Sequence, residues 1–165
     1  MSDSKSPEFR NALKEFDAQN YDKVQRLCDK MISKNPKDAD ALALKGLSYY
    51  YLKQPDKAEQ TLKEALKANF KSSVAWHFYA DFLKERGDYI KAMQSYNKSL
   101  NYSSTELTVI RDLSHLQLYL RQIESFVESS RLAVEVRPGL ITNWIALAFG
   151  YFLLKDYPRD RKSVV

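Results

Sequence analysis

Glycine, proline and cysteine are all scarce in this 165-residue sequence, which contains four glycines, five prolines and one cysteine. An all-β sandwich or barrel needs many turns marked by glycine and proline, so the composition disfavours those folds. A single cysteine excludes an internal disulfide framework. The longest apolar run, from Trp144 to Leu154, is too short to cross a bilayer, and the first residues lack the basic and apolar segments of a secretory signal.

The remaining composition is typical of a folded helical protein, with 44% hydrophobic, 28% charged and 13% aromatic residues. The net charge of +5 is modest, and a solvated surface is enough to account for it. The alternative for the charge is a nucleic-acid patch, which a net charge of this size does not demand. We therefore expect a cytoplasmic protein without a membrane segment, with the nucleus as the alternative compartment, and we expect no DNA partner.

The clearest pattern is self-similarity at a fixed spacing. Four turn-and-helix starts, at Asn20, Gln54, Asp88 and Gln122, follow one another in steps of 34 residues, and Asp156 falls on the same step. Thirty-four residues is the period of the tetratricopeptide repeat, a hairpin of two antiparallel helices, A and B. The sequence therefore predicts an all-α fold, a right-handed superhelical solenoid of tetratricopeptide-type hairpins with four complete repeats and the first helix of a fifth.

The same register predicts the domain organisation. Repeats should start near residues 5, 39, 73, 107 and 141, within an array over residues 8–157. A flexible tail is expected at residues 1–7 and an irregular tail at residues 158–165. Small residues should let the paired helices approach closely, as Gly46 does against Ala58, and Trp76 should fill the space between two hairpins. Asp38, Ser72 or Ser73, and Thr105 are expected to cap the A helices.

The fifth A helix, from about Thr142 to Leu154, is apolar around most of its circumference. A helix of that kind expects neighbours on two sides. We therefore expect Trp144, Leu147, Tyr151 and Leu154 to leave an exposed apolar patch through which the chain self-associates.

In arrays of this kind, fixed positions of each A helix line a concave groove that binds partner segments. The well-known readers of chaperone tails place Lys, Asn and Arg there to hold a C-terminal carboxylate, but this sequence has Ala43, His77 and Arg111 at successive fifth positions. A groove rich in Tyr and Phe suits an apolar or helical segment better. The alternative is that many of these rings pack on the neighbouring hairpin. The predicted groove residues are Phe9, Phe16, Tyr50, Tyr51, His77, Asp81, His115, Tyr119, Phe149 and Phe152.

No catalytic, cofactor-binding or metal site is predicted. His77 and His115 lie in neighbouring repeats without a second histidine one turn away or a cysteine, so a structural role is favoured over a metal pair or a catalytic base. Cys28 occupies a core position of the first hairpin, which favours an inert buried thiol over a nucleophile. A glycine-rich phosphate loop, a serine elbow and paired carboxylates are also lacking.

Three lysines, Lys63, Lys67 and Lys71, recur at steps of four residues on the second B helix and its flank. Such a basic stripe can contact RNA phosphates. The alternative is a solvated outer face.

Several strings go beyond the generic repeat. Lys71-Ser72-x-x-x-Trp76-His77-x-Tyr79 and Ile110-Arg111-Asp112-Leu113-Ser114-x-Leu116-Gln117 carry the most weight. Further strings of the same kind are Lys45-Gly46-Leu47, Leu66-Lys67-x-Asn69, the Leu-x-x-x-Arg-Pro segment ending at Pro138, Trp144-Ile145 and Leu153-Leu154-x-Asp156-Tyr157. Over residues 9–157 the chain resembles the N-terminal repeat region of the auxiliary subunit of NatA, an N-terminal acetyltransferase complex.

The resemblance implies a non-catalytic subunit that supports co-translational N-terminal acetylation, with catalysis on a separate acetyltransferase subunit. It also implies contacts with that catalytic subunit, mainly outside this fragment, and with the ribosome or the nascent chain. Family members are several times longer, so we expect the sequence to be an N-terminal fragment, a truncated product or the result of a gene model cut short. The alternative function is a stand-alone peptide-binding adaptor of the chaperone or complex-assembly type, which an intact reading frame ending at Val165 would favour.

Overall fold

The computed structural model describes residues 6–160, and their side chains over residues 6–155. This part of the chain is all α-helical, and the helices run as A and B partners of successive hairpins. The helices are α1 (Pro7–Asp17), α2 (Tyr21–Lys34), α3 (Ala39–Tyr51), α4 (Pro55–Ala68), α5 (Ser73–Glu85), α6 (Tyr89–Tyr102), α7 (Leu107–Tyr119), α8 (Ile123–Val136) and α9 (Ile141–Asp160).

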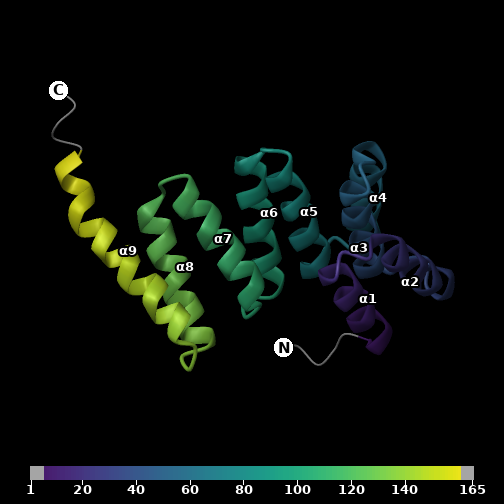
Figure 1. The fold of residues 1–165 in the computed structure, drawn as a ribbon, viewed down its shortest axis with the longest axis horizontal. Coiled ribbons are helices and arrows are strands. Elements are labelled where there is room, and N and C mark those ends of the chain that lie inside the picture. Colours follow the sequence, from purple (N-terminus) through teal and green to yellow (C-terminus); the bar gives the residue numbers. More distant parts are fainter. Residues whose placement is uncertain (1–5, 161–165) are drawn as a thin grey trace. The chain divides into compact units, whose positions relative to one another are not determined.

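The chain divides into two compact units, residues 1–103 and residues 104–165. In the first unit, α3 packs against α2, α4 and α5, while α1 packs against α2 and α5 against α6 (Figure 1). In the second unit, α8 contacts both α7 and α9. The fold is therefore the predicted one, with four complete tetratricopeptide-type hairpins followed by the first helix of a fifth.

The turn inside each hairpin has one geometry. In each of the four complete hairpins, the second residue after the end of the A helix has a left-handed backbone, with φ between 56° and 80°. The N–H of that residue and the N–H of the next donate to carbonyls three and five residues earlier, the bonding pattern that ends many helices. Glycine adopts this conformation without a steric cost, but only one of the four turns has a glycine at this position. The four residues are Gln19, Lys53, Gly87 and Arg121.

Two of the three predicted caps are present. The carboxylate of Asp38 and the hydroxyl of Ser72 each accept a hydrogen bond from the backbone N–H three residues on, at 3.0 Å and 2.9 Å. The prediction for Thr105 was wrong, because the residue directly before α7 is Glu106, whose side chain makes no capping bond. The repeat register places the cap of this helix one residue later than Thr105, at the equivalent of Asp38 and Ser72.

Close helix approach in the second hairpin depends on Gly46. A Cβ atom built on Gly46 would lie 2.8 Å from Cγ of Leu62 on α4, which is too close for any real contact. The expected neighbour, Ala58, is also fully buried, but Leu62 is the residue that limits the spacing. Trp76 is 6% exposed, and its indole N–H donates to the carbonyl of Phe70 at 2.7 Å.

α9 packs on α8 through two residues that were predicted from the sequence to be exposed to solvent. Leu147 is buried with Val127 and Val134 of α8, and Leu154 packs against the same cluster. Two members of the predicted exposed patch, Leu147 and Leu154, therefore belong to the α8 contact. At 3.6 residues per turn they lie roughly 60–80° around the helix from Trp144, which is enough to turn them toward α8. The large apolar side chains that α9 exposes are Ile141, Trp144, Ile145, Phe149, Tyr151 and Phe152.

The ends of the array also differ in detail from the expectation. Ser6 caps α1 and Pro7 is its first residue, whereas residues 1–5 lie outside the described part. α9 runs through Asp160, so residues 158–160 are helical rather than irregular, and the rest of that predicted tail is not described. A proline removes one N–H donor, but a helix can continue past it. Among the described residues, no helix has both the length and the hydropathy needed to span a membrane.

Candidate interaction site

The predicted groove residues of the first unit gather around one aromatic cluster. Phe16 of α1 lies edge-on to Tyr51 of α3, with ring centroids 5.6 Å apart, and near-parallel to Phe78 of α5 at 6.5 Å. Tyr21 of α2 stacks on Tyr51 at 5.0 Å. Burial raises the pKa of Tyr51 to about 12. The rings of Phe16 and Tyr51 thus hold three hairpins together, which is the packing alternative that the sequence left open.

Tyr50 is committed to the same packing. Its ring meets that of Phe82 edge-on at 5.6 Å, and its hydroxyl donates to the carbonyl of Glu85 at 3.2 Å. Phe9 is 4% exposed, so its side chain is part of the core and does not line an open surface. The prediction that Phe9 lines the groove is therefore wrong, because the first turn of α1 points this residue inward.

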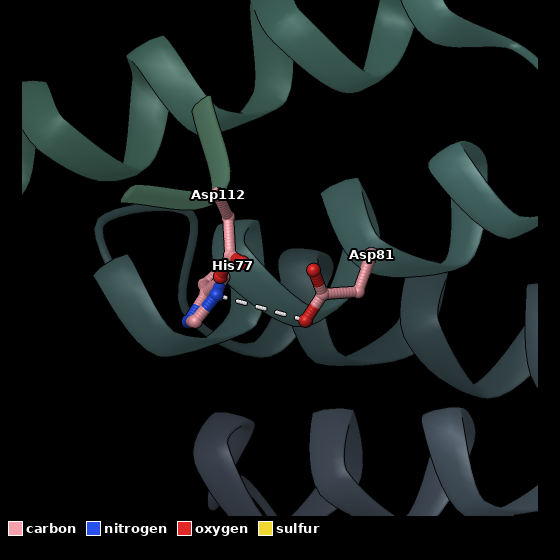
Figure 2. Close-up of side chains that lie close together, drawn as sticks. All are labelled: His77, Asp81 and Asp112. Atoms are coloured by element: carbon pink, nitrogen blue, oxygen red, sulfur yellow. Dashed lines mark ion pairs between the residues drawn. The ribbon is translucent and has the colours of Figure 1, made fainter. Parts of the chain in front are cut away.

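His77 and Asp81 lie one turn apart on α5, with Nε2 of His77 3.6 Å from Oδ2 of Asp81 (Figure 2). The hydroxyl of Tyr96 on α6 donates to Oδ1 of Asp81 at 2.5 Å, and Lys84 approaches the same oxygen at 3.5 Å. The Asp112 drawn in the figure belongs to the second unit. Inside the first unit, Asp81 is a hydrogen-bonded link between α5 and α6.

A groove of about 480 Å³ lies within the second unit, between α7, α8 and α9. Of the four groove residues predicted there, His115 and Phe149 line it, whereas Tyr119 and Phe152 do not and are 67% and 60% exposed. The walls are mostly apolar, and none of the lining residues is acidic. They are Arg111, Ser114, His115, Leu118, Phe126, Ser130, Ala133, Thr142, Asn143, Ile145, Ala146 and Phe149.

Arg111 is held in this groove by a buried amide. The Asn143 side chain is 2% exposed and donates to the carbonyls of Ala133 and Arg137, at 2.8 Å and 3.1 Å. Its oxygen is thereby turned toward Arg111, which donates from Nη2 to Asn143 at 3.2 Å and to the Thr142 hydroxyl at 3.1 Å. The guanidinium is fixed through one nitrogen, and its other donors carry no bond in the described structure.

The sequence prediction missed Asn143, although a signal for it was present. The residues one, two and three periods earlier are Val109, Ala75 and Ala41, all of them buried and apolar. A polar side chain in a buried position of that kind needs hydrogen bonds to offset its desolvation. The departure from the repeat pattern at residue 143 thus indicated a polar network, but not its partner.

The three predicted RNA-contacting lysines do not form one continuous stripe. Lys63 and Lys67 lie on α4, whereas Lys71 lies in the loop after it, because α4 ends at Ala68. All three are exposed. Lys63 pairs with Glu59 at 2.6 Å, and the same carboxylate also binds Arg86 at 2.6 Å, so part of the local positive charge is compensated.

Cys28 is fully buried in the first hairpin. Burial, which disfavours the thiolate, raises the pKa of its thiol to about 12, with a smaller contribution from the negative charge of Asp29. The neutral thiol is therefore the form present at physiological pH, and it is a poor nucleophile.

Comparison with known proteins agrees with this geometry. Two models of the tetratricopeptide repeat family match residues 15–82 and residues 73–106, which together cover more than half of the chain. The chain is 34% identical over 152 residues to the human N-alpha-acetyltransferase 16, NatA auxiliary subunit. That match covers 90% of this chain and 18% of the human protein.

A second relative is the N-terminal acetyltransferase A complex auxiliary subunit NAA15 of Arabidopsis thaliana, which is 27% identical over 145 residues. That match covers 88% of this chain and 16% of the plant protein. Among solved structures, Naa15/Naa10 bound to HypK-THB superposes with a TM-score of 0.78 at 26% identity, over 92% of this chain and 23% of that one. The chain thus spans about a fifth of the length of these relatives. It belongs to the tetratricopeptide repeat family and, within it, is a relative of the NatA auxiliary subunits.

Proposed function

We propose that this chain is a non-catalytic scaffold segment of an N-terminal acetyltransferase complex of the NatA type. The observation that carries the proposal is the 34% identity to a NatA auxiliary subunit across 90% of the chain. The proposal agrees with the arrangement of the described helices, in which aromatic side chains such as Phe16, Tyr50 and Tyr51 pack against neighbouring helices.

The partner of such a scaffold would be a catalytic acetyltransferase. One related structure contains Naa15 together with Naa10 and HypK-THB. Because this chain covers 23% of that Naa15 chain, we place the main contact with the catalytic subunit outside the present residues. The scaffold would act in the cytoplasm, where nascent chains emerge.

Deletion of the gene in the organism that encodes it tests this role. Mass spectrometry of protein N-termini should then show reduced acetylation at a defined subset, and reintroduction of the natural gene should restore it. Unchanged acetylation across all detected N-termini would contradict the proposal. That result would favour a stand-alone adaptor, which predicts altered binding partners without any change in acetylation.

A finer part of the proposal concerns the ribosome. Lys67 and Lys71 are exposed, and the structure gives neither side chain an ion-pair partner, so they are the lysines available for RNA phosphates. Lys63 would contribute less because Glu59 already binds it. Contacts of this kind are insensitive to RNA sequence and weaken steeply with salt.

Charge reversal at Lys63, Lys67 and Lys71 tests this contact in the natural full-length protein. Co-sedimentation with ribosomes should fall, and the residual binding should depend less on salt. The matched control is charge reversal at Lys23, Lys30 and Lys37, which are exposed lysines of α2 and of the loop after it. As in the first set, one of the three, Lys23, has an ion-pair partner. Equal co-sedimentation of wild type and the first triple variant would remove these lysines from the interface.

A further inference from the structure

The fourth hairpin has an opening where the other hairpins are filled. Ser130 of α8 occupies the repeat position that holds Tyr96, Leu62 and Cys28 in the preceding hairpins, and all three of those side chains are fully buried. Replacement of a large side chain by a hydroxymethyl group leaves space above α8, and the groove of about 480 Å³ is lined by Ser130 at this point. This volume is in the range of sites that hold small ligands or a few side chains.

The groove contains a polar atom that nothing in the described structure satisfies. Ser130 is 1% exposed, and its Oγ has no hydrogen-bond partner. A buried hydroxyl without a partner is destabilising, so groups of this kind call for an explanation. Serine at this position is both smaller and more polar than the repeat requires, which suits a site that receives a hydrogen-bonding group from outside.

A positive charge is fixed at the same groove. Arg111 is held by Thr142 and by Asn143, whose amide is in turn held by two backbone carbonyls of the α8 C-terminus and its following turn. The guanidinium keeps unused donors, and a carboxylate is the group that matches a guanidinium in geometry and charge. Since no lining residue is acidic, the charge of Arg111 is not neutralised from within the groove.

The rest of the groove wall is apolar and therefore favours a ligand with apolar groups. Leu118, Ile145 and Phe149 lie along the groove, and Ile145 and Phe149 remain 61% and 45% exposed. One cation in such a setting balances one negative charge. A phosphate dianion would leave a second charge uncompensated beside apolar walls, which is unfavourable. The chemistry therefore favours a single carboxylate next to aliphatic or aromatic side chains.

We propose that this groove between α7, α8 and α9 binds a peptide segment in which one Asp or Glu side chain is flanked by apolar residues. The carboxylate meets Arg111 and the Ser130 hydroxyl, and the apolar side chains cover Phe149, Ile145 and Leu118. Asn143 acts as a positioning residue for Arg111. This binding site is independent of the acetyltransferase role, because it rests on the second unit alone.

A random peptide library identifies the ligand chemistry. The probe is a library of twelve-residue peptides displayed on phage within a coat protein, so that neither peptide end is free, selected against the full 165-residue chain. Enriched peptides should share an Asp or Glu beside Leu, Ile or Phe. No enrichment, or enrichment of peptides that lack an acidic residue, would overturn the proposal.

The enriched peptide is then synthesised with blocked ends, and its affinity is measured by fluorescence anisotropy. Arg111→Gln should weaken binding about tenfold or more, the effect expected for loss of a hydrogen-bonded charge. Arg121→Gln removes the same charge from an exposed turn outside the groove and should leave binding unchanged. Equal losses in the two variants would mean that Arg111 supplies only general charge, and the proposal would fail.

Ser130→Leu places in the groove the side chain that the second hairpin has at this position. It should abolish binding while thermal unfolding stays cooperative, and wild-type affinity in this variant would refute the site. If Ser130→Leu prevents folding, the comparison of Arg111→Gln with Arg121→Gln tests the proposal by itself.

Replacement of the peptide's Glu by Gln should also abolish binding. Tighter binding of a phosphoserine version than of the Glu peptide, or of a free C-terminus in place of the Glu, would refute the assigned ligand.

Discussion

Trp76 and Trp144 occupy the same position two repeats apart, yet their surroundings differ, and this difference supports a quantitative prediction. Each indole N–H donates to the carbonyl six residues earlier, at 2.7 Å and 2.8 Å. Trp76 is 6% exposed, whereas Trp144 is 51% exposed. Lys98 of α6 also lies over the Trp76 ring, with Nζ 4.3 Å from its centroid. The fifth repeat has no described B helix that could cover Trp144 in this way.

The size of the effect follows from the buried area. A buried aromatic side chain removes about 150–250 Å² from water, which at about 25 cal/mol per Å² gives about 4–6 kcal/mol as an upper estimate. After allowance for the alanine that remains, Trp76→Ala should lower the free energy of unfolding by about 3–5 kcal/mol. For Trp144→Ala the loss should be about half as large, because half of its surface is already in water.

Urea unfolding followed by far-UV circular dichroism measures both values, and Trp→Phe at each position is the conservative control. The indole hydrogen bond is lost in both alanine variants, so its contribution largely cancels in the comparison. A loss below about 1 kcal/mol for Trp76→Ala would place that ring at the surface. Equal losses at the two positions would contradict the assigned register.

Four further predictions concern other elements. Gly46→Ala should lower the free energy of unfolding by about 1–3 kcal/mol, because its Cβ would lie 2.8 Å from an α4 side chain, and an unchanged urea midpoint would contradict this. Arg121→Gly should stabilise the chain by up to about 1 kcal/mol and Gly87→Ala should destabilise it, because both residues have a positive φ, which favours glycine. A lower melting temperature for Arg121→Gly together with a higher one for Gly87→Ala would refute the turn geometry. Cys28 should react with a thiol reagent only after unfolding, so rapid labelling of the native chain would show that it is accessible. The six exposed large apolar side chains of α9 predict self-association, which light scattering would contradict by finding a monodisperse monomer.

The fold was predictable because its signal is spread over the whole chain. The 34-residue step sets the start of every hairpin, and the small residues and tryptophans recur on the same step, so an error at one position does not shift the others. The cap at residue 105 was missed by one residue for a related reason. Local preference for Thr was followed there instead of the period, which points to Glu106.

The site was less predictable, because burial depends on which neighbour each face meets. Phe9 and Tyr50 are aromatic residues at the repeat positions that line a groove. Phe9 is nevertheless buried in the core, and the ring of Tyr50 packs against Phe82. The groove of the second unit is determined instead by departures from the repeat, namely Ser130 in place of a large residue and Asn143 in place of a small apolar one. Such departures are visible in the sequence, but their meaning depends on contacts between helices.

The most direct test of the account is to purify the natural gene product under mild conditions from the organism that encodes it and to identify its companions by mass spectrometry. Membership of a NatA-type complex predicts an N-terminal acetyltransferase chain in stoichiometric amount, together with acetylation of N-terminal peptides by the purified complex. Recovery of the gene product with neither an acetyltransferase chain nor that activity would contradict the proposed function.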